Sequence, residues 1–298
     1  MSQDHLHKKA WVIAVDMGYG HQRTAHPLRH IAYGRTVVNA NHYEGIPEKD
    51  RNFWRRNRMS YEFISRFRRV PIIGLATFLL FDAFQRIMGY YPKRDLSKSN
   101  WGGKIVFYFI KKGGGADLIH RLRQKPLPFL STFFTPAFMA EKLHYPGDIY
   151  CIICDADIAR IWAPLHPKSS RIKYFVPNTW TRDRLKLYGV RQENIILTGY
   201  PLPKENIGQD MEIVKKDLRY RILNLDPKGK YRRLYAPLLK SYLGQLPNLP
   251  NHPLTFMFSI GGAGAQKEIA LAMIDQLKEK IKAKELKFII DRDNLLAV

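Results

Sequence analysis

Short apolar segments alternate along the chain with segments whose apolar residues recur at helical spacing. The apolar segments are rich in β-branched residues, as is typical of strands buried in a parallel sheet. Strands are predicted at residues 11–16, 36–40, 128–134, 149–154, 172–176, 194–197, 254–258 and 286–290. Helices are predicted at residues 22–33, 116–124, 137–143, 179–188 and 266–284, whereas 104–110 fits a helix or a strand. This alternation predicts an α/β protein with a doubly wound parallel sheet.

Two glycine-rich turns each follow a predicted strand and precede a predicted helix, at residues 16–21 and 259–265. A helix N-terminus offers unpaired backbone N–H groups and a positive dipole end, which suit phosphate or another anion. Glycine lets the backbone approach such an anion closely. The two turns therefore predict two α/β domains that face each other across a cleft, each binding one reactant.

The pattern divides the chain into three regions. Residues 1–204 form an N-terminal domain, in which a helical insertion at 51–93 interrupts the βα alternation. Residues 205–253 form a charged, mostly helical connection, and residues 254–298 begin a second domain. One βαβ unit does not make a domain, because its sheet needs more strands to enclose a core. We therefore expect the second domain to be incomplete and the sequence to be truncated.

The chain carries a large excess of positive charge. Its 298 residues include 49 Lys and Arg against 26 Asp and Glu, which gives a formal net charge of +23. Such an excess favours a polyanionic partner, namely an anionic membrane surface, nucleic acid or phosphorylated substrates. A generally basic proteome is the alternative explanation.

The two cysteines, Cys151 and Cys154, are too few for a disulfide scaffold and fit a reducing compartment. Their CxxC spacing is typical of a redox or zinc motif, but it lies within the predicted strand 149–154. Residues three apart on a strand point to opposite faces of the sheet. We therefore predict two structural cysteines and no metal site.

The insertion at 51–93 combines arginines with aromatic residues. Seven arginines lie within residues 51–69, interleaved with Phe, Trp and Tyr, and an apolar run follows at 70–81. Arginines attract anionic headgroups, and large apolar side chains insert into the membrane interface. The predicted membrane-docking residues are Trp54, Arg66, Arg68, Arg69, Phe78 and Phe81. A core helix pair with a solvated basic face is the alternative, and nucleic acid is not expected, since no recognisable binding module accompanies the arginines.

The longest apolar run, at 70–81, is shorter than the about 20 residues that a membrane span needs. The N-terminal apolar run at 11–15 is too short for a signal peptide. We therefore expect a cytoplasmic protein that associates peripherally with the inner face of the membrane.

Four features, in their order and spacing, resemble the GT-B glycosyltransferases. They are Gly18-Tyr19-Gly20-His21, the segments 174–178, 184–190 and 195–201, the stretch from Leu218 to Pro227, and the turn from Gly261 to Gly264. The most similar types are the enzyme that adds N-acetylglucosamine to the undecaprenyl-linked muramyl intermediate and the monogalactosyldiacylglycerol synthases. The first turn has one glycine fewer than the family's form, and the family's donor-sugar motif after the second turn is absent.

The resemblance implies two Rossmann-type domains, a nucleotide-sugar donor and a lipid-linked or membrane-associated acceptor, with no cofactor and no metal ion. His21 or Asp155, at predicted strand ends, would deprotonate the acceptor hydroxyl. The predicted acceptor-binding residues are Gly18, Gly20, Thr132, Asp157 and Arg160, and the predicted donor-phosphate residues are Gly261, Gly262 and Gly264.

Each of these side chains also has a structural alternative. His21 could only cap its turn, Thr132 could be an ordinary strand-end residue, and Asp157 could cap the segment that follows it. Arg160 could pair with Asp157 instead of holding an acceptor phosphate.

Two other functions compete with sugar transfer. A nucleotide-sugar 2-epimerase on the same fold would need no lipid dock, and a basic α/β binding protein would need no catalytic residues. Fold analogy by itself does not establish the chemistry.

Overall fold

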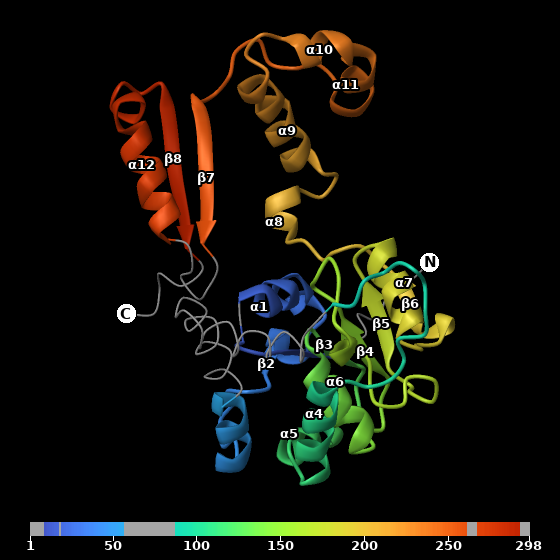
Figure 1. Ribbon diagram of the computed structural model, residues 1–298. Helices are drawn as coiled ribbons and strands as arrows, with labels where there is room; N and C mark the ends of the chain where they lie inside the picture. Colours follow the sequence, from blue (N-terminus) through green and yellow to red (C-terminus); the bar gives the residue numbers. More distant parts are fainter. Residues whose placement is uncertain (1–8, 18, 57–86, 261–266, 293–298) are drawn as a thin grey trace, which may run out of the picture. The chain divides into compact units, whose positions relative to one another are not determined.

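The computed structural model of the protein describes residues 9–17, 19–56, 87–260 and 267–292 (Figure 1). The chain consists of two compact units, Met1–Pro201 and Leu202–Val298. Several predicted site residues lie outside the described residues, and their roles stay predictions: Gly18, Arg66, Arg68, Arg69, Phe78, Phe81, Gly261, Gly262 and Gly264.

The first unit is built on a six-stranded parallel sheet in the order β2-β1-β3-β4-β5-β6 (Figure 1). The strands are β1 (Trp11–Ala14), β2 (Val38–Asn39), β3 (Phe129–Ser131), β4 (Ile149–Ile152), β5 (Lys173–Val176) and β6 (Ile195–Leu197). The predicted α/β class with a parallel sheet is confirmed. Each strand of this sheet is shorter than predicted. β1 and β4 end early although burial continues past them, as Val15 and Ile153 show, whereas β5 and β6 begin one residue later than predicted.

The helices of the first unit connect these strands. The longer ones are α1 (Tyr19–Ala25), the 3₁₀ helix η1 (His26–His30), α4 (Trp101–Lys111), α5 (Ala116–Arg123), α6 (Phe134–Lys142) and α7 (Thr179–Leu187), and the short 3₁₀ helices are η2 (Tyr33–Arg35), η3 (Arg160–Trp162) and η4 (Gln192–Asn194). The predicted helix at 22–33 is divided between α1 and η1, because Pro27 in the first turn of η1 has no N–H to continue the α-helical pattern.

Two asparagines begin helices of this unit. Asn100 caps α4, which settles 104–110 as helical, and its side chain accepts a hydrogen bond from the backbone N–H of Gly103. Asn178 caps α7 through a 2.7 Å bond from the N–H of Thr181. The helix predicted at 179–188 therefore begins at Thr179, directly after its cap Asn178.

The two faces of the sheet have separate cores. Ile13 belongs to a large core that includes buried side chains of α4, α5, α6 and α7. Val12 and Ala14 point to the opposite face, where Ala25 of α1 and Leu28 of η1 pack on them. This follows from the alternation of side chains along a strand. β1 is therefore covered on both faces, as a central strand of a doubly wound sheet requires.

Trp54 lies in the large core. It is 4% exposed, within a helical stretch at 48–56, and its ring centroid is 5.4 Å from that of Phe53 and 6.5 Å from that of Phe133. The prediction that Trp54 docks on a membrane is therefore wrong. The composition of the segment could not separate the two roles, because a packed indole and an interfacial indole both need a large apolar side chain.

The second unit contains α8 (Lys204–Ile207), α9 (Glu212–Leu225), α10 (Lys230–Leu234), α11 (Ala236–Leu243), β7 (Leu254–Ile260), α12 (Lys267–Lys282) and β8 (Leu286–Arg292). β7 and β8 form a two-stranded parallel sheet, and α12 packs against β8 (Figure 1). The strands that precede the two glycine turns therefore belong to separate sheets.

Among the helices formed by the described residues, none combines the length and the apolar character that crossing a membrane would require.

Candidate functional site

The connectivity of the sheet makes one edge of the first unit the candidate ligand site. β1 pairs with β2 on one side and with β3 on the other, so the chain reverses its direction of progress across the sheet at β1. In open parallel sheets, ligands bind at the carboxyl ends of the strands beside such a reversal. The segments that follow β1, β3 and β4 meet there.

His21 joins the segments that follow β1 and β3. Its Nδ1 lies 2.9 Å from the backbone carbonyl oxygen of Thr132. A carbonyl oxygen only accepts hydrogen bonds, so Nδ1 carries the proton and Nε2 carries the lone pair. The ring also packs edge-to-face on Phe133, with 4.7 Å between centroids. The structure thus fixes both the tautomer and the orientation of this imidazole.

Burial lowers the pKa of His21 below its ordinary value of 6.5, although the bond to the Thr132 carbonyl acts in the opposite direction. The neutral imidazole is therefore the favoured form near neutral pH. A neutral ring with a lone pair on Nε2 has the protonation state that a general base needs.

Asp155 follows β4 at the same edge of the sheet. Its side chain is exposed, yet the protein around it removes enough water from the carboxylate to raise its pKa above 3.8. Within the described part of the chain, no group donates a hydrogen bond to this carboxylate. Asp155 is therefore accessible, and its ionised form is destabilised, as is typical of carboxylates that take part in proton transfer.

Cys154 is a site residue that the sequence analysis missed. Its Sγ lies 3.2 Å from Nδ1 of His21. Burial, with a smaller effect from the charge of Asp155, raises the pKa of Cys154 to about 12, so the group is a neutral thiol. Cys151 is fully buried, as predicted. The polar residues from Asp155 onward could have indicated that the strand ends before Cys154. They could thus have distinguished this cysteine from the buried Cys151.

Thr132 supports His21 instead of facing a ligand. Its side chain is fully buried, and Oγ1 donates a 3.0 Å hydrogen bond to the backbone carbonyl of His21. The predicted contact between Thr132 and an acceptor is therefore corrected to a role in holding the β1 turn against β3. Gly20 is exposed in α1, and no other group lies within 4 Å of where a Cβ would be.

The segment after β6 reaches the same region. The hydroxyl of Tyr200 lies 2.7 Å from Oγ1 of Thr24 in α1, and Thr24 also donates to the backbone carbonyl of Gly20 at 2.8 Å. Tyr200 lies in the segment 195–201, but nothing in its spacing connects it with the first glycine turn. Only the fold brings these residues together.

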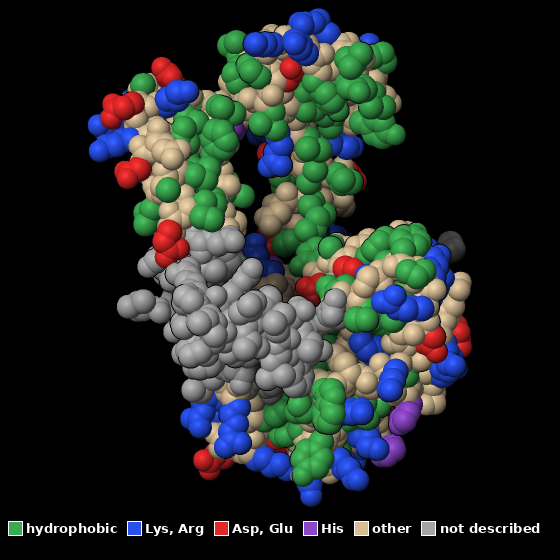
Figure 2. All heavy atoms as spheres, viewed as in Figure 1, with side chains coloured by type: hydrophobic (Ala, Val, Ile, Leu, Met, Phe, Trp, Pro, Cys, Tyr) green, Lys and Arg blue, Asp and Glu red, His purple; other side chains and the backbone are tan. Residues whose placement is uncertain are grey.

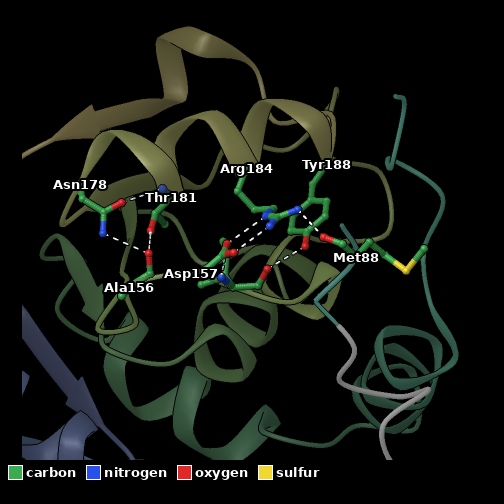
Figure 3. A network of polar contacts seen from close by, with 8 residues as sticks. Met88, Ala156, Asp157, Asn178, Thr181, Arg184 and Tyr188 are labelled. Atoms are coloured by element: carbon green, nitrogen blue, oxygen red, sulfur yellow. Dashed lines mark hydrogen bonds and ion pairs between the residues drawn. The ribbon is translucent and has the colours of Figure 1, made fainter. Parts of the chain in front are cut away.

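Asp157 belongs to a structural network (Figure 3). Its carboxylate accepts two hydrogen bonds from Arg184 of α7, at 2.9 Å from Nε and 2.7 Å from Nη2. Nη1 of Arg184 donates to the carbonyl of Met88 at 2.7 Å, and the Arg184 side chain is 2% exposed. Burial acts to raise the pKa of Asp157, but the bonds from Arg184, Trp180 and the Ile158 amide lower it overall. The predicted acceptor-binding role of Asp157 is corrected to this ion pair.

Arg160 is buried and bound to backbone carbonyls. Its guanidinium donates to the carbonyls of Ser97 at 2.6 Å, Ala163 at 2.6 Å and Pro164 at 3.0 Å. Both predictions for Arg160, an ion pair with Asp157 and an acceptor phosphate, are therefore wrong. Burial lowers its pKa. These bonds instead hold the segment 160–164 and the stretch before α4 together.

Within the described residues, no group of three or more His, Cys, Asp and Glu side chains is placed to hold a metal ion. Of the predicted site residues, the structure brings His21 and Asp155 to one edge of the sheet. The side chains of Thr132, Asp157 and Arg160 instead hydrogen-bond to other parts of the protein. No protein-family model, curated protein or solved structure matches this chain.

Proposed function

We propose that this protein is a GT-B-type glycosyltransferase that moves a sugar from a nucleotide-sugar donor to a membrane-associated or lipid-linked acceptor. The observation that carries the proposal is the pairing of His21 with the Thr132 carbonyl at the reversal point of the parallel sheet, with Asp155 at the same edge. This pairing leaves Nε2 of His21 unprotonated beside the place where ligands of such sheets bind.

The acceptor hydroxyl attacks the anomeric carbon of the donor in the proposed reaction. A new bond forms between the acceptor oxygen and that carbon, and the bond from the carbon to the nucleotide diphosphate breaks. The hydroxyl proton passes to Nε2 of His21, which Thr132 orients through Nδ1. The resemblance to the GT-B enzymes assigns the binding of the donor diphosphate to Gly261, Gly262 and Gly264, which lie outside the described residues.

Asp155 is the second candidate for the base. Its raised pKa favours proton uptake, and its exposure leaves the carboxylate open to a substrate. His21 is the stronger candidate because its tautomer is fixed, whereas Asp155 has no described hydrogen-bond partner to orient it. Removing a general base costs about 10²- to 10⁴-fold in rate.

The test is transfer by the purified full-length enzyme from a panel of nucleotide sugars labelled in the sugar, with a total membrane-lipid extract as acceptor. We expect label in the lipid phase with at least one donor, and a loss of about 10²- to 10⁴-fold in His21→Ala. His42→Ala, an exposed histidine after β2, is the matched control and should retain activity.

The outcomes separate the rival functions. Neither transfer nor hydrolysis with any donor would refute the proposal. Recovery of an epimerised nucleotide sugar would identify an epimerase instead. Full transfer by a His21→Ala, Asp155→Ala double variant would remove the catalytic assignment.

A further inference from the structure

Helix α4 has two apolar faces, and one of them lies on the surface. Val106 and Ile110 point into the large core. Trp101, Ile105 and Tyr108, spaced by four and three residues, lie on the other face and are 72%, 50% and 64% exposed. A helix needs only one apolar stripe to pack on a core. Packing on the core therefore does not explain the exposed apolar side chains of α4.

Lysines surround this exposed stripe. Nζ of Lys104 lies 5.3 Å from the ring centroid of Trp101, and Nζ of Lys112 lies 5.7 Å from that of Tyr108. Figure 2 shows Lys and Arg side chains beside hydrophobic ones at the end of the molecule where Figure 1 places α4 and α5. Aromatic rings alternating with ammonium groups are typical of helices that lie in a membrane interface, where the headgroups are anionic.

A cavity of about 530 Å³ adjoins this stripe, between α4, the end of α6 and the segment 164–171. Phe107, Tyr108 and Leu165 contribute apolar wall, and Lys104, Lys111 and Lys142 contribute ammonium groups. The cavity therefore combines apolar walls with several cations.

The single carboxylate of the cavity wall, Glu141, is already engaged. Its Oε1 accepts hydrogen bonds from Oγ of Ser170 and from the backbone N–H of Arg171, each at 2.7 Å. The three lysines have no carboxylate partner among the described residues. An anion with an apolar portion is the ligand class that matches this lining.

We infer that α4 and the adjoining cavity bind an acidic phospholipid, with its headgroup phosphate among Lys104, Lys111 and Lys142 and its acyl region against the exposed stripe. The inference rests on the proposed function, since lipid binding would hold the enzyme beside its membrane acceptor. It assigns membrane docking to surface residues of α4 in place of the buried Trp54.

The test is flotation of the full chain with vesicles, in the absence of any sugar donor. Vesicles of phosphatidylcholine alone are compared with vesicles that contain about 30 mol% phosphatidylglycerol, at about 100 mM salt. We expect binding to the acidic vesicles only. Lys104→Glu with Lys111→Glu should weaken the partition at least about tenfold, because each lysine contributes to headgroup attraction.

Three controls keep the result specific to this surface. Lys215→Glu with Lys216→Glu, on exposed positions of α9, changes the net charge equally and should bind as wild type. Trp101→Ala with Tyr108→Ala should also weaken vesicle binding, since these side chains are exposed and their loss leaves the core intact. Circular dichroism and thermal unfolding establish that each variant is folded.

Several outcomes would overturn the inference. They are equal binding to both kinds of vesicle, an undiminished partition of the Lys104, Lys111 variant, and an equal loss in the α9 control. Competition by inorganic phosphate as strong as that by a soluble short-chain phosphatidylglycerol would identify a site for free phosphate instead. Tight binding to single-stranded DNA that depends on the lysines, but not on Trp101 and Tyr108, would identify a nucleic-acid surface. Because no donor is present, none of these results depends on sugar transfer.

Discussion

The edge of the sheet around His21 and the network around Arg184 each contain an aspartate, and the two aspartates differ in exposure, hydrogen-bond partners and pKa. Asp155 and Asp157 both follow β4 and are separated by one residue. Asp155 is exposed, has no described hydrogen-bond donor, and has a raised pKa. Asp157 is held by two bonds from Arg184 and has a lowered pKa. The same type of side chain is thus exposed and without a described partner in one region, and held in an ion pair in the other.

The difference teaches that a strand end does not by itself mark a catalytic residue. Asp157 is stabilised as an anion because α7 brings a guanidinium that is almost fully buried to within hydrogen-bond distance. Asp155 loses water without gaining a partner, so its anion is disfavoured. Perturbed groups without structural partners are the better functional candidates.

The largest expected effect comes from a matched pair of isosteric substitutions. Asp157→Asn should lower the free energy of unfolding by about 3 kcal/mol, because it leaves the buried charge of Arg184 without its partner. Asp155→Asn should change stability by less than about 1 kcal/mol in either direction, since no described partner is lost. Urea unfolding of both variants measures the contrast. Equal losses at the two positions would show that Asp155 also belongs to the structural network.

The second prediction concerns pH. Asp157, with its lowered pKa, contributes stability that is present above pH 3.8 and is lost as the pH falls through its folded pKa. Asp155, with its raised pKa, makes a contribution that is complete below pH 3.8 and is lost as the pH rises through its folded pKa. Carboxyl NMR titration should therefore give midpoints on opposite sides of 3.8. Two midpoints on the same side would contradict the comparison.

His21 should titrate below 6.5, with the proton of the neutral ring on Nδ1. The folded protein then gains stability from the neutral ring above pH 6.5 and loses it as the pH falls through the folded pKa. Nitrogen-15 NMR of the imidazole reports both the midpoint and the tautomer. A proton on Nε2 would contradict the bond to Thr132 and would remove the proposed base.

The smallest expected effect lies at the cap of α7. Asn178 accepts a bond from the N–H of Thr181 and donates one to the carbonyl of Ala156 at 3.1 Å, which ties the segment between the two aspartates to α7 (Figure 3). Asn178→Ala should cost about 1 kcal/mol in thermal unfolding, the usual cost of a lost N-cap. Asn178→Asp keeps the acceptor for Thr181 and should recover most of this loss. A loss of transfer activity without a loss of stability would place Asn178 in the site instead.

Much of the fold could be predicted because it depends on local patterns. Apolar runs located every strand of the first unit, although α1 begins at Tyr19, inside the predicted glycine turn at 16–21. Strand ends also placed His21 and Asp155 at a site edge. Cys154 and Tyr200 were missed, because their contacts with His21 and Thr24 join segments 133 and 176 residues apart. Spacing in the sequence carries no trace of such contacts.

The sequence by itself determined the α/β class, the parallel strands and the positive charge, because hydrophobic period, strand composition and charge are properties of neighbouring residues or of simple counts. Only the tertiary structure decided the partners. It placed Trp54 in the core, Arg184 on Asp157, Arg160 on three carbonyls, and a lysine-lined cavity beside the exposed stripe of α4. The physical reason is that burial and pairing fix the role of a polar or aromatic side chain, and both depend on which distant segments the fold brings to it.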